Sequence, residues 1–118
     1  MDITYIQDDK ASFERMLKKA GRGKYVFRLF VTGTTSKSIR AISNMKAFCE
    51  AYLPGRYTLE VVDIYQQPGL AKQEQILAAP TLIKELPMPL RRLIGDLTDT
   101  NRVLLALDLP DDLEDVKS

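Results

Sequence analysis

An almost continuous apolar run covers residues 24–31, KYVFRLFV, and is rich in aromatic and β-branched side chains. Such a run predicts a strand that is covered on both faces of its sheet. Gly33 follows, and Thr35 or Ser36 can then cap a helix that runs to about residue 52. The apolar positions of this helix recur at three- and four-residue steps and predict one buried stripe. The stripe comprises Ile39, Ile42, Met45, Cys49 and Leu53.

A second strand–helix unit follows the stop signal at Pro54 and Gly55. Residues 58–65, TLEVVDIY, predict a strand, and residues 66–77 predict a helix with Pro68 near its first turn. A strand, a helix and a further strand form a right-handed crossover, so we expect the first two strands to be parallel.

Two short strands come next, on either side of a proline turn. Residues 81–86, TLIKEL, and residues 91–97, RRLIGDL, predict these strands, and Pro87 and Pro89 bracket the turn between them. We expect this half of the sheet to be antiparallel.

The final apolar run, residues 101–109 (NRVLLALDL), is ambiguous in its period. Alternate positions suit a strand face, whereas three- and four-residue steps suit a helix that Thr98 or Thr100 could cap. With a helix here the order is βαβαββα, an α/β arrangement that is thioredoxin-like. In folds of this kind a proline at the start of the third strand is typically cis, and Pro80 occupies that position.

The sequence pattern divides the chain of 118 residues into three parts. Residues 1–22 are expected to form an N-terminal extension with one short helix, residues 23–109 the thioredoxin-like domain, and residues 110–118 an acidic tail. One domain of this size can bury a core of its own.

Composition narrows the classes of function. Seventeen basic and sixteen acidic residues nearly cancel, which removes any general attraction to nucleic acid or to an anionic membrane. The chain has no histidine, the usual general base and commonest metal ligand, and its single cysteine excludes an intramolecular disulfide. The first ten residues lack the pattern of a signal peptide, and no apolar run approaches the ~18 residues of a membrane span. We therefore expect a cytoplasmic protein without a metal site.

Candidate chemistry centres on the strand-to-helix corner in residues 30–38, FVTGTTSKS, which offers no thiol. A phosphate-binding loop would need a second glycine where Ser36 stands, so an ordinary capped corner is the better interpretation. Cys49 lies on the apolar stripe, with no histidine to activate it, and is interpreted as a core residue. Glu60 and Asp63 lie three apart on a strand, and hence on opposite faces, so they do not form an acid–base pair. We expect no catalytic residue and no cofactor.

Three motifs resemble those of the KaiB family. They are YVFRLFVTGTT at residues 25–35, QQPGLAKQEQILAAPTL at residues 66–82, and LPMPLRRLIGDLTD at residues 86–99, which leads into VLLALDL. The resemblance implies a non-catalytic regulator of circadian or stress-related signalling that docks on KaiC, a hexameric ATPase, and then engages KaiA-like or histidine-kinase proteins. It also implies a metamorphic fold, in which the thioredoxin-like form is monomeric and a ground state of order βαββααβ is a homo-oligomer, either a dimer or a tetramer.

The same resemblance identifies two sets of residues. The partner-binding set comprises Arg40, Gln67, Leu70, Ala71, Gln75, Lys84 and Arg92. The fold-switch set comprises Pro80, Pro87, Pro89, Ala106 and Asp108. Ala106 stands where family members usually have glycine, an exchange that favours a helix interior by ~1 kcal/mol and therefore the thioredoxin-like form. Two other hypotheses are a thiol oxidoreductase or glutathione-binding protein that uses Cys49, and an oligomeric scaffold with an unrelated partner.

Overall fold

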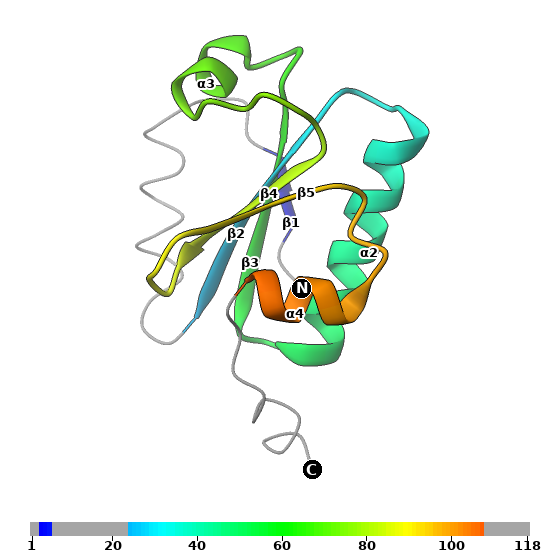
Figure 1. Ribbon diagram of the computed structural model, residues 1–118, viewed down its shortest axis with the longest axis vertical. Helices are drawn as coiled ribbons and strands as arrows, with labels where there is room; N and C mark the ends of the chain where they lie inside the picture. Colours follow the sequence, from blue (N-terminus) through cyan, green and yellow to red (C-terminus); the bar gives the residue numbers. More distant parts are fainter. Residues whose placement is uncertain (1–2, 6–23, 108–118) are drawn as a thin grey trace.

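The computed structural model describes residues 3–5 and 24–107, which form a five-stranded mixed sheet flanked by helices (Figure 1). Along the sheet the strands follow the order β1-β3-β2-β4-β5. They span Ile3–Tyr5 (β1), Tyr25–Val31 (β2), Tyr57–Asp63 (β3), Thr81–Leu86 (β4) and Arg91–Ile94 (β5). The helices span Ser36–Tyr52 (α2), Pro68–Gln73 (α3) and Thr100–Ala106 (α4). Strands β1, β3 and β2 are parallel, and β4 and β5 complete the antiparallel half. The predicted element order from residue 24 onward is thus confirmed.

The edge strand β1 is not predicted by the sequence pattern. It pairs in parallel with residues 59–61 of β3. A segment of three residues is too short to show a period, and pairing with a neighbouring strand supplies what the local sequence does not. The helix predicted within residues 1–22 and the acidic tail at residues 110–118 lie outside the described residues.

Both faces of the central strand β2 are covered, as its continuous apolar run predicts. Alternate residues from Tyr25 to Val31 point into the larger core beneath α2 and α4. On the opposite face Phe30 packs with Val62, Leu70 and Ile83 beneath α3. Figure 1 shows α2 and α4 on one side of the sheet, with α3 near the end at which β2 and β3 finish.

Helix α2 begins where the sequence predicts, although its buried face is rotated. The Thr35 hydroxyl accepts a hydrogen bond from the Ser38 N–H at 3.2 Å and caps the first turn. The predicted stripe is wrong at Ile39, whose side chain is 54% exposed. The buried residues of the helix are Ser38, Ala41, Met45, Phe48 and Cys49. Ile39 and the partly buried Ile42 therefore lie on the flank of α2.

Helix α3 is shorter than the predicted segment of residues 66–77. The Gln75 N–H donates to the Lys72 carbonyl at 3.1 Å, and the Ile76 N–H donates to the Ala71 carbonyl at 2.9 Å. This pair of bonds is a Schellman motif, and it requires a left-handed residue that is usually glycine. Gln75 takes that position with φ of 57°. The helix therefore ends where the sequence contains neither a glycine nor a proline that would predict its end.

The ambiguous last run is helical. Val103 and Leu107 are buried, whereas Leu105 between them is 80% exposed. On a strand all three side chains would face the same side, so their burial fits only the helical period.

The cap of α4 differs from the prediction. The Asp99 carboxylate, rather than Thr98 or Thr100, accepts a hydrogen bond from the Arg102 N–H at 3.2 Å. Thr98 is engaged elsewhere, because its hydroxyl donates to Asp96 at 2.7 Å.

The prolines around β4 all follow cis peptide bonds. The bond before Pro80 is cis, as predicted, and so are those before Pro87 and Pro89. Pro80 is buried, and its carbonyl accepts a hydrogen bond from the Gly95 N–H at 3.0 Å. Pro87 and Pro89 lie in the exposed turn between β4 and β5.

Candidate partner-binding surface

The strand-to-helix corner after β2 is held together by its own polar groups. The Asp63 carboxylate accepts hydrogen bonds from the Gly33 N–H at 3.2 Å and from the Tyr65 N–H at 2.9 Å. It thereby ties the corner to the end of β3. The Ser38 hydroxyl accepts from the Thr32 N–H at 3.0 Å. The polar side chains named here brace the corner, and none of them is a thiol or an imidazole.

Cys49 is enclosed in the larger core, as the sequence predicts. Burial, and to a lesser extent the nearby Glu50 carboxylate, raises the pKa of the Cys49 thiol. A nucleophilic cysteine needs a stabilised thiolate, and this environment disfavours one.

The predicted residues on and beside α3 divide into a buried and an accessible group. Leu70 and Ala71 are 6% and 8% exposed, and Leu70 packs against the sheet. Gln75 is exposed in the left-handed turn after the helix, and Gln67 is partly exposed at its start. The exposed residues of the helix itself are Pro68, Gly69, Lys72 and Gln73.

Two large apolar side chains next to α3 are not identified from the sequence. Tyr65 lies before the helix and is 73% exposed, and Leu77 lies after it and is 95% exposed. The sequence pattern places both inside regular elements, Tyr65 in a strand and Leu77 in a helix. Only the early ends of β3 and α3 leave them on loops facing solvent. We call Tyr65, Gln67, Gln75 and Leu77 the α3 surface.

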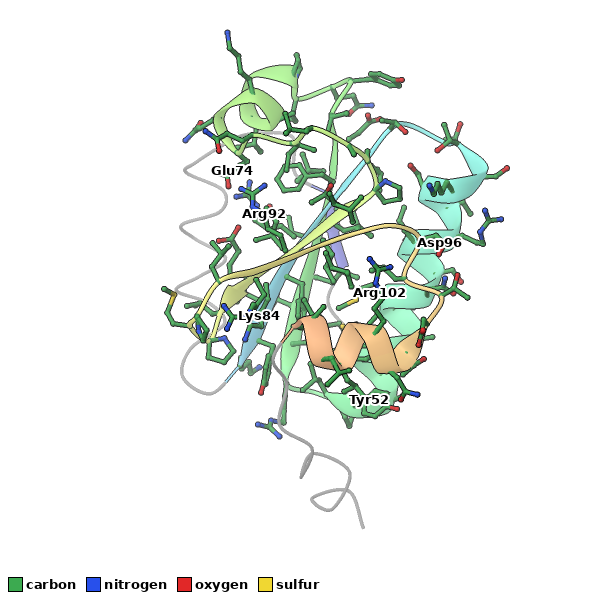
Figure 2. All side chains as sticks on the ribbon, in the orientation of Figure 1. Tyr52, Glu74, Lys84, Arg92, Asp96 and Arg102 are labelled. Carbon is green, nitrogen blue, oxygen red and sulfur yellow. The ribbon has the colours of Figure 1, made fainter. Side chains whose placement is uncertain are left out.

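The basic residues predicted to bind a partner do not lie together. The Arg92 guanidinium donates to the Glu74 carbonyl at 2.6 Å, which places it beside the end of α3 (Figure 2). Arg40 is on α2, where its Nε lies 3.3 Å from the Asp96 carboxylate. The resemblance places Lys84 in the partner-binding set, but the structure buries this residue, which is 2% exposed. Its side chain points to the same face of β4 as Leu82, which is part of the larger core.

The connection between β5 and α4 is fastened to α2. The Asn44 side chain donates to the Asp96 carbonyl at 2.8 Å, in addition to the contact between Arg40 and Asp96. Hydrogen bonds from Thr98, together with the Arg40 guanidinium, lower the pKa of Asp96. We call Arg40, Asn44 and Asp96 the α2–α4 latch. Of the fold-switch set, Ala106 is partly buried against the larger core at the end of α4, and Asp108 lies outside the described residues.

A buried charge cluster occupies the α3 face of the sheet. The Arg28 Nε lies 2.8 Å from the Glu60 carboxylate, and its Nη1 lies 3.6 Å from Glu85 and 3.9 Å from Glu74. Arg28 and Glu60 are 2% and 0% exposed. They are direct neighbours across β2 and β3, so aligning the two predicted strands in register could have revealed the pair. We call these four residues the Arg28 cluster.

One guanidinium faces three carboxylates in this cluster, and the carboxylates respond to burial. Burial raises the pKa of Glu60 to about 7, although Arg28 opposes the shift. Burial likewise raises the pKa of Glu85, and Arg28 again opposes it. The Glu60 and Glu85 Oε2 atoms are buried and make no hydrogen bond. The cluster is therefore a charged element of the core.

The described part of the chain brings no three carboxylate or thiol ligands close enough together to hold a metal ion. None of its helices has the length and apolar character needed to cross a membrane.

The sequence is similar to proteins of one family, and the fold is similar to solved structures of the predicted class. The KaiB domain family model matches residues 28–109. The circadian clock oscillator protein KaiB of Prochlorococcus marinus is 48% identical over 90 residues, which are 76% of this chain and 83% of the relative. The protein of the same name from Synechococcus elongatus is 47% identical over 88 residues, 75% of this chain and 86% of the relative. That of Gloeothece citriformis is 45% identical over 98 residues, 82% and 92% of the two chains.

Solved structures with the same fold include thioredoxins. Chloroplastic thioredoxin z superposes with a TM-score of 0.70 at 14% identity and covers 98% of this chain and 96% of its own. Thioredoxin from Fasciola hepatica gives a TM-score of 0.68 at 14% identity, with 92% and 97% of the two chains covered. At this identity the likeness concerns the fold alone, and it confirms the predicted thioredoxin-like class.

Proposed function

This chain belongs to the KaiB family, and on that premise we propose that it is a non-catalytic regulatory protein that docks on a KaiC-like ATPase through the α3 surface. The relatives named above are circadian clock oscillator proteins, which supports a role in circadian or related stress signalling. In this proposal KaiA-like or histidine-kinase proteins join the complex afterwards.

The exposure of Tyr65 and Leu77 carries the proposal. Exposed apolar surface that extends beyond a single residue marks interaction sites, and Tyr65 and Leu77 place two large exposed side chains on either side of the short helix α3. Aromatic side chains are also enriched among the few residues that dominate binding energy at interfaces. Gln67, Gln75 and Arg92 would supply the polar rim around the two apolar residues.

The α3 surface is also held in place by contacts between α3 and the sheet. Leu70 packs against the sheet, Ala71 is buried next to it, and Arg92 donates to the carbonyl of Glu74 at the end of the helix. In the proposal Leu70 and Ala71 therefore act by holding the surface in shape. Binding residues on rigid supports lose less conformational entropy when a partner docks.

A thiol-dependent enzyme receives no support from the geometry. The corner offers hydroxyl and carboxylate groups, and Cys49 is enclosed beneath α2 with its pKa raised. The proposal therefore assigns the thioredoxin-like scaffold a binding role.

The test is a binding measurement with the KaiC homologue of the same organism, in the presence of ATP and of ADP. The unmodified chain is compared with Leu77→Asp and Tyr65→Ala, both of which change exposed residues. We expect each variant to weaken binding about tenfold or more, the effect of losing a central apolar contact.

Met88→Asp is the matched control, because Met88 is 72% exposed but lies in the turn between β4 and β5. It should bind like the unmodified chain. Absence of any complex with the KaiC homologue, or equal losses for Leu77→Asp and Met88→Asp, would contradict the proposed surface.

A further inference from the structure

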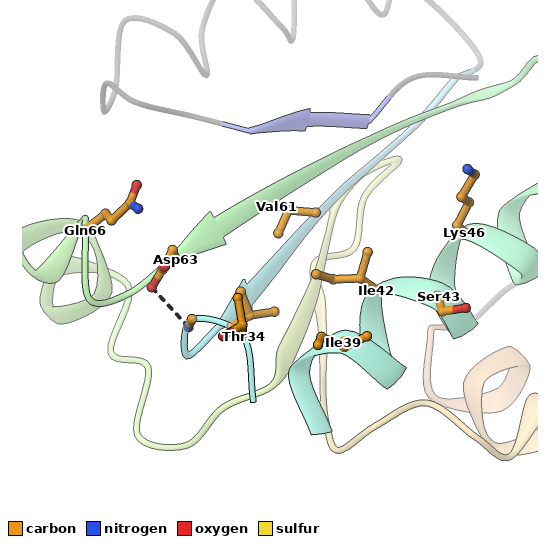
Figure 3. Close-up of a pocket in the computed structure, with 10 residues that line it drawn as sticks. Thr34, Ile39, Ile42, Ser43, Lys46, Val61, Asp63 and Gln66 are labelled. Carbon is orange, nitrogen blue, oxygen red and sulfur yellow. Dashed lines mark hydrogen bonds between the residues drawn. The ribbon is translucent and has the colours of Figure 1, made fainter. Parts of the chain in front are cut away.

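An open pocket of about 620 Å³ lies between the first half of α2 and the ends of β2 and β3 (Figure 3). Its main walls are the flank of α2 and the face of the sheet under that helix, and at the corner Asp63 and Gln66 bring it next to the α3 surface. Small-molecule sites usually enclose ~300–1,000 Å³. The pocket is therefore large enough for an organic molecule and far larger than a single missing side chain.

The interior of the pocket is apolar. Val31 and Val61 line it from the sheet, and Ile39 and Ile42 line it from the helix. Ile39 is exposed on the flank of α2, and Ile42 beside it is partly buried against the larger core. Ile39, which is 54% exposed, thus places an apolar side chain at the mouth of the pocket.

The two charged groups stand at opposite ends of the pocket, as Figure 3 shows. Asp63 is at the corner, where its Oδ1 already accepts hydrogen bonds from the N–H groups of Gly33 and Tyr65. Lys46 lies seven residues after Ile39 and therefore on the same flank of α2. Among the described residues that line the pocket, Lys46 is the one cation and Asp63 the one anion.

We propose that this pocket binds a small amphiphilic carboxylate, with its apolar body against Val31, Val61, Ile39 and Ile42 and its acid group beside Lys46. The occupant is a free small molecule, because the site is a concavity of ligand size with a corner braced in advance by Asp63. An acid fits the end of the pocket at which Lys46 is exposed, whereas at the other end the Oδ1 of Asp63 already accepts two N–H donors. An apolar body of a few carbon–carbon bonds is needed to cover both valines and both isoleucines.

The proposal is tested with 4-phenylbutyrate and with 4-phenylbutan-1-ol, which share the same body and differ in the charged group. Each probe is titrated into the ¹⁵N-labelled full chain and followed by ¹H–¹⁵N correlation spectra. The amide signals of Gly33, Ile42, Lys46 and Val61 should shift saturably with the acid, and the alcohol should bind about fivefold more weakly, as expected for the loss of one partly exposed ion pair.

Two lysine variants on α2 make the result specific. Lys46→Gln should weaken the binding of 4-phenylbutyrate about fivefold and leave the binding of the alcohol unchanged. Lys37→Gln changes another exposed lysine of the same helix, outside the pocket, and should alter neither probe. The proposal is overturned if the shifts do not saturate or lie away from the pocket. It is also overturned if the acid and the alcohol bind equally, or if both lysine variants weaken the binding of the acid to the same extent. Because these spectra need no KaiC homologue, their outcome is independent of the proposed docking function.

Discussion

The Arg28 cluster predicts that the folded protein gains stability as the pH falls from 8 to 6. Glu60 has a folded pKa of about 7 against an ordinary value of 4.5, because burial penalises its charged form. A carboxyl group whose pKa is higher in the folded state binds its proton more tightly there than in the unfolded chain. Protonation between pH 8 and pH 6 therefore favours folding, and the gain is lost again as the pH rises through 7.

The size of the effect follows from the two pKa values. Linkage between them gives about 1 kcal/mol of additional stability at pH 6 relative to pH 8. With the urea dependence usual for a small domain, this corresponds to a rise of about 0.5–1 M in the unfolding midpoint. The charged groups that face Glu60 in the described structure are Arg28 and Glu85, and the raised pKa of Glu85 acts in the same direction.

The assay is urea unfolding followed by circular dichroism at several values between pH 6 and pH 8. The chain suits this window, because it has no histidine to titrate there. Glu60→Gln keeps the shape of the side chain and removes its titration, so most of the pH dependence should disappear. The α-amino group titrates near this range but is present in both proteins, so their difference isolates Glu60.

Glu50→Gln is the matched control, since Glu50 is exposed and outside the cluster, and glutamine can still accept the hydrogen bond from Tyr57. It should retain the pH dependence of the unmodified chain. A midpoint that is constant or that falls on acidification, or a Glu60→Gln variant with an unchanged slope, would refute the reasoning.

Three further predictions concern the turns and the last helix. Gln75→Gly should raise the free energy of unfolding by up to about 1 kcal/mol, because glycine adopts the left-handed turn without strain; a decrease in thermal unfolding measurements would contradict this. Asn44→Ala should lower it by about 1 kcal/mol through the lost bond to Asp96, whereas Arg40→Ala, which removes an exposed ion pair, should cost less; the reverse order in urea unfolding would show that the latch is held by charge. Ala106→Gly should destabilise α4 by up to about 1 kcal/mol and increase any dimer or tetramer seen by size-exclusion chromatography, and an unchanged elution profile would argue against a role for Ala106 in the fold switch.

The sequence predicts best those elements whose local pattern agrees with their burial. The bounds of β4 match the predicted residues, and α2 begins at the residue after the Thr35 cap and ends at Tyr52. In both cases a long period or a clear turn signal decides the element. The α3 helix is shorter because its end depends on Gln75 adopting a left-handed conformation, which residue type does not indicate.

The site residues that the sequence did not identify have a common physical cause. Which side chains pair, and which face of an element is buried, is decided by residues far away in the sequence. Arg28 and Glu60 look like isolated charges until β2 and β3 are placed in register. Lys84 looks like a surface residue until the alternation of β4 directs it toward Leu82. Tyr65 and Leu77 become surface residues only because the neighbouring elements end early.

The enclosure of Cys49 has a practical consequence for experiments on this protein. It is the one cysteine in the chain, and maleimide reagents require an accessible thiolate, so the unmodified protein should be nearly silent to them. A cysteine introduced in place of Leu77 would then carry a single fluorophore or spin label at a defined position, without first removing the native sulfur.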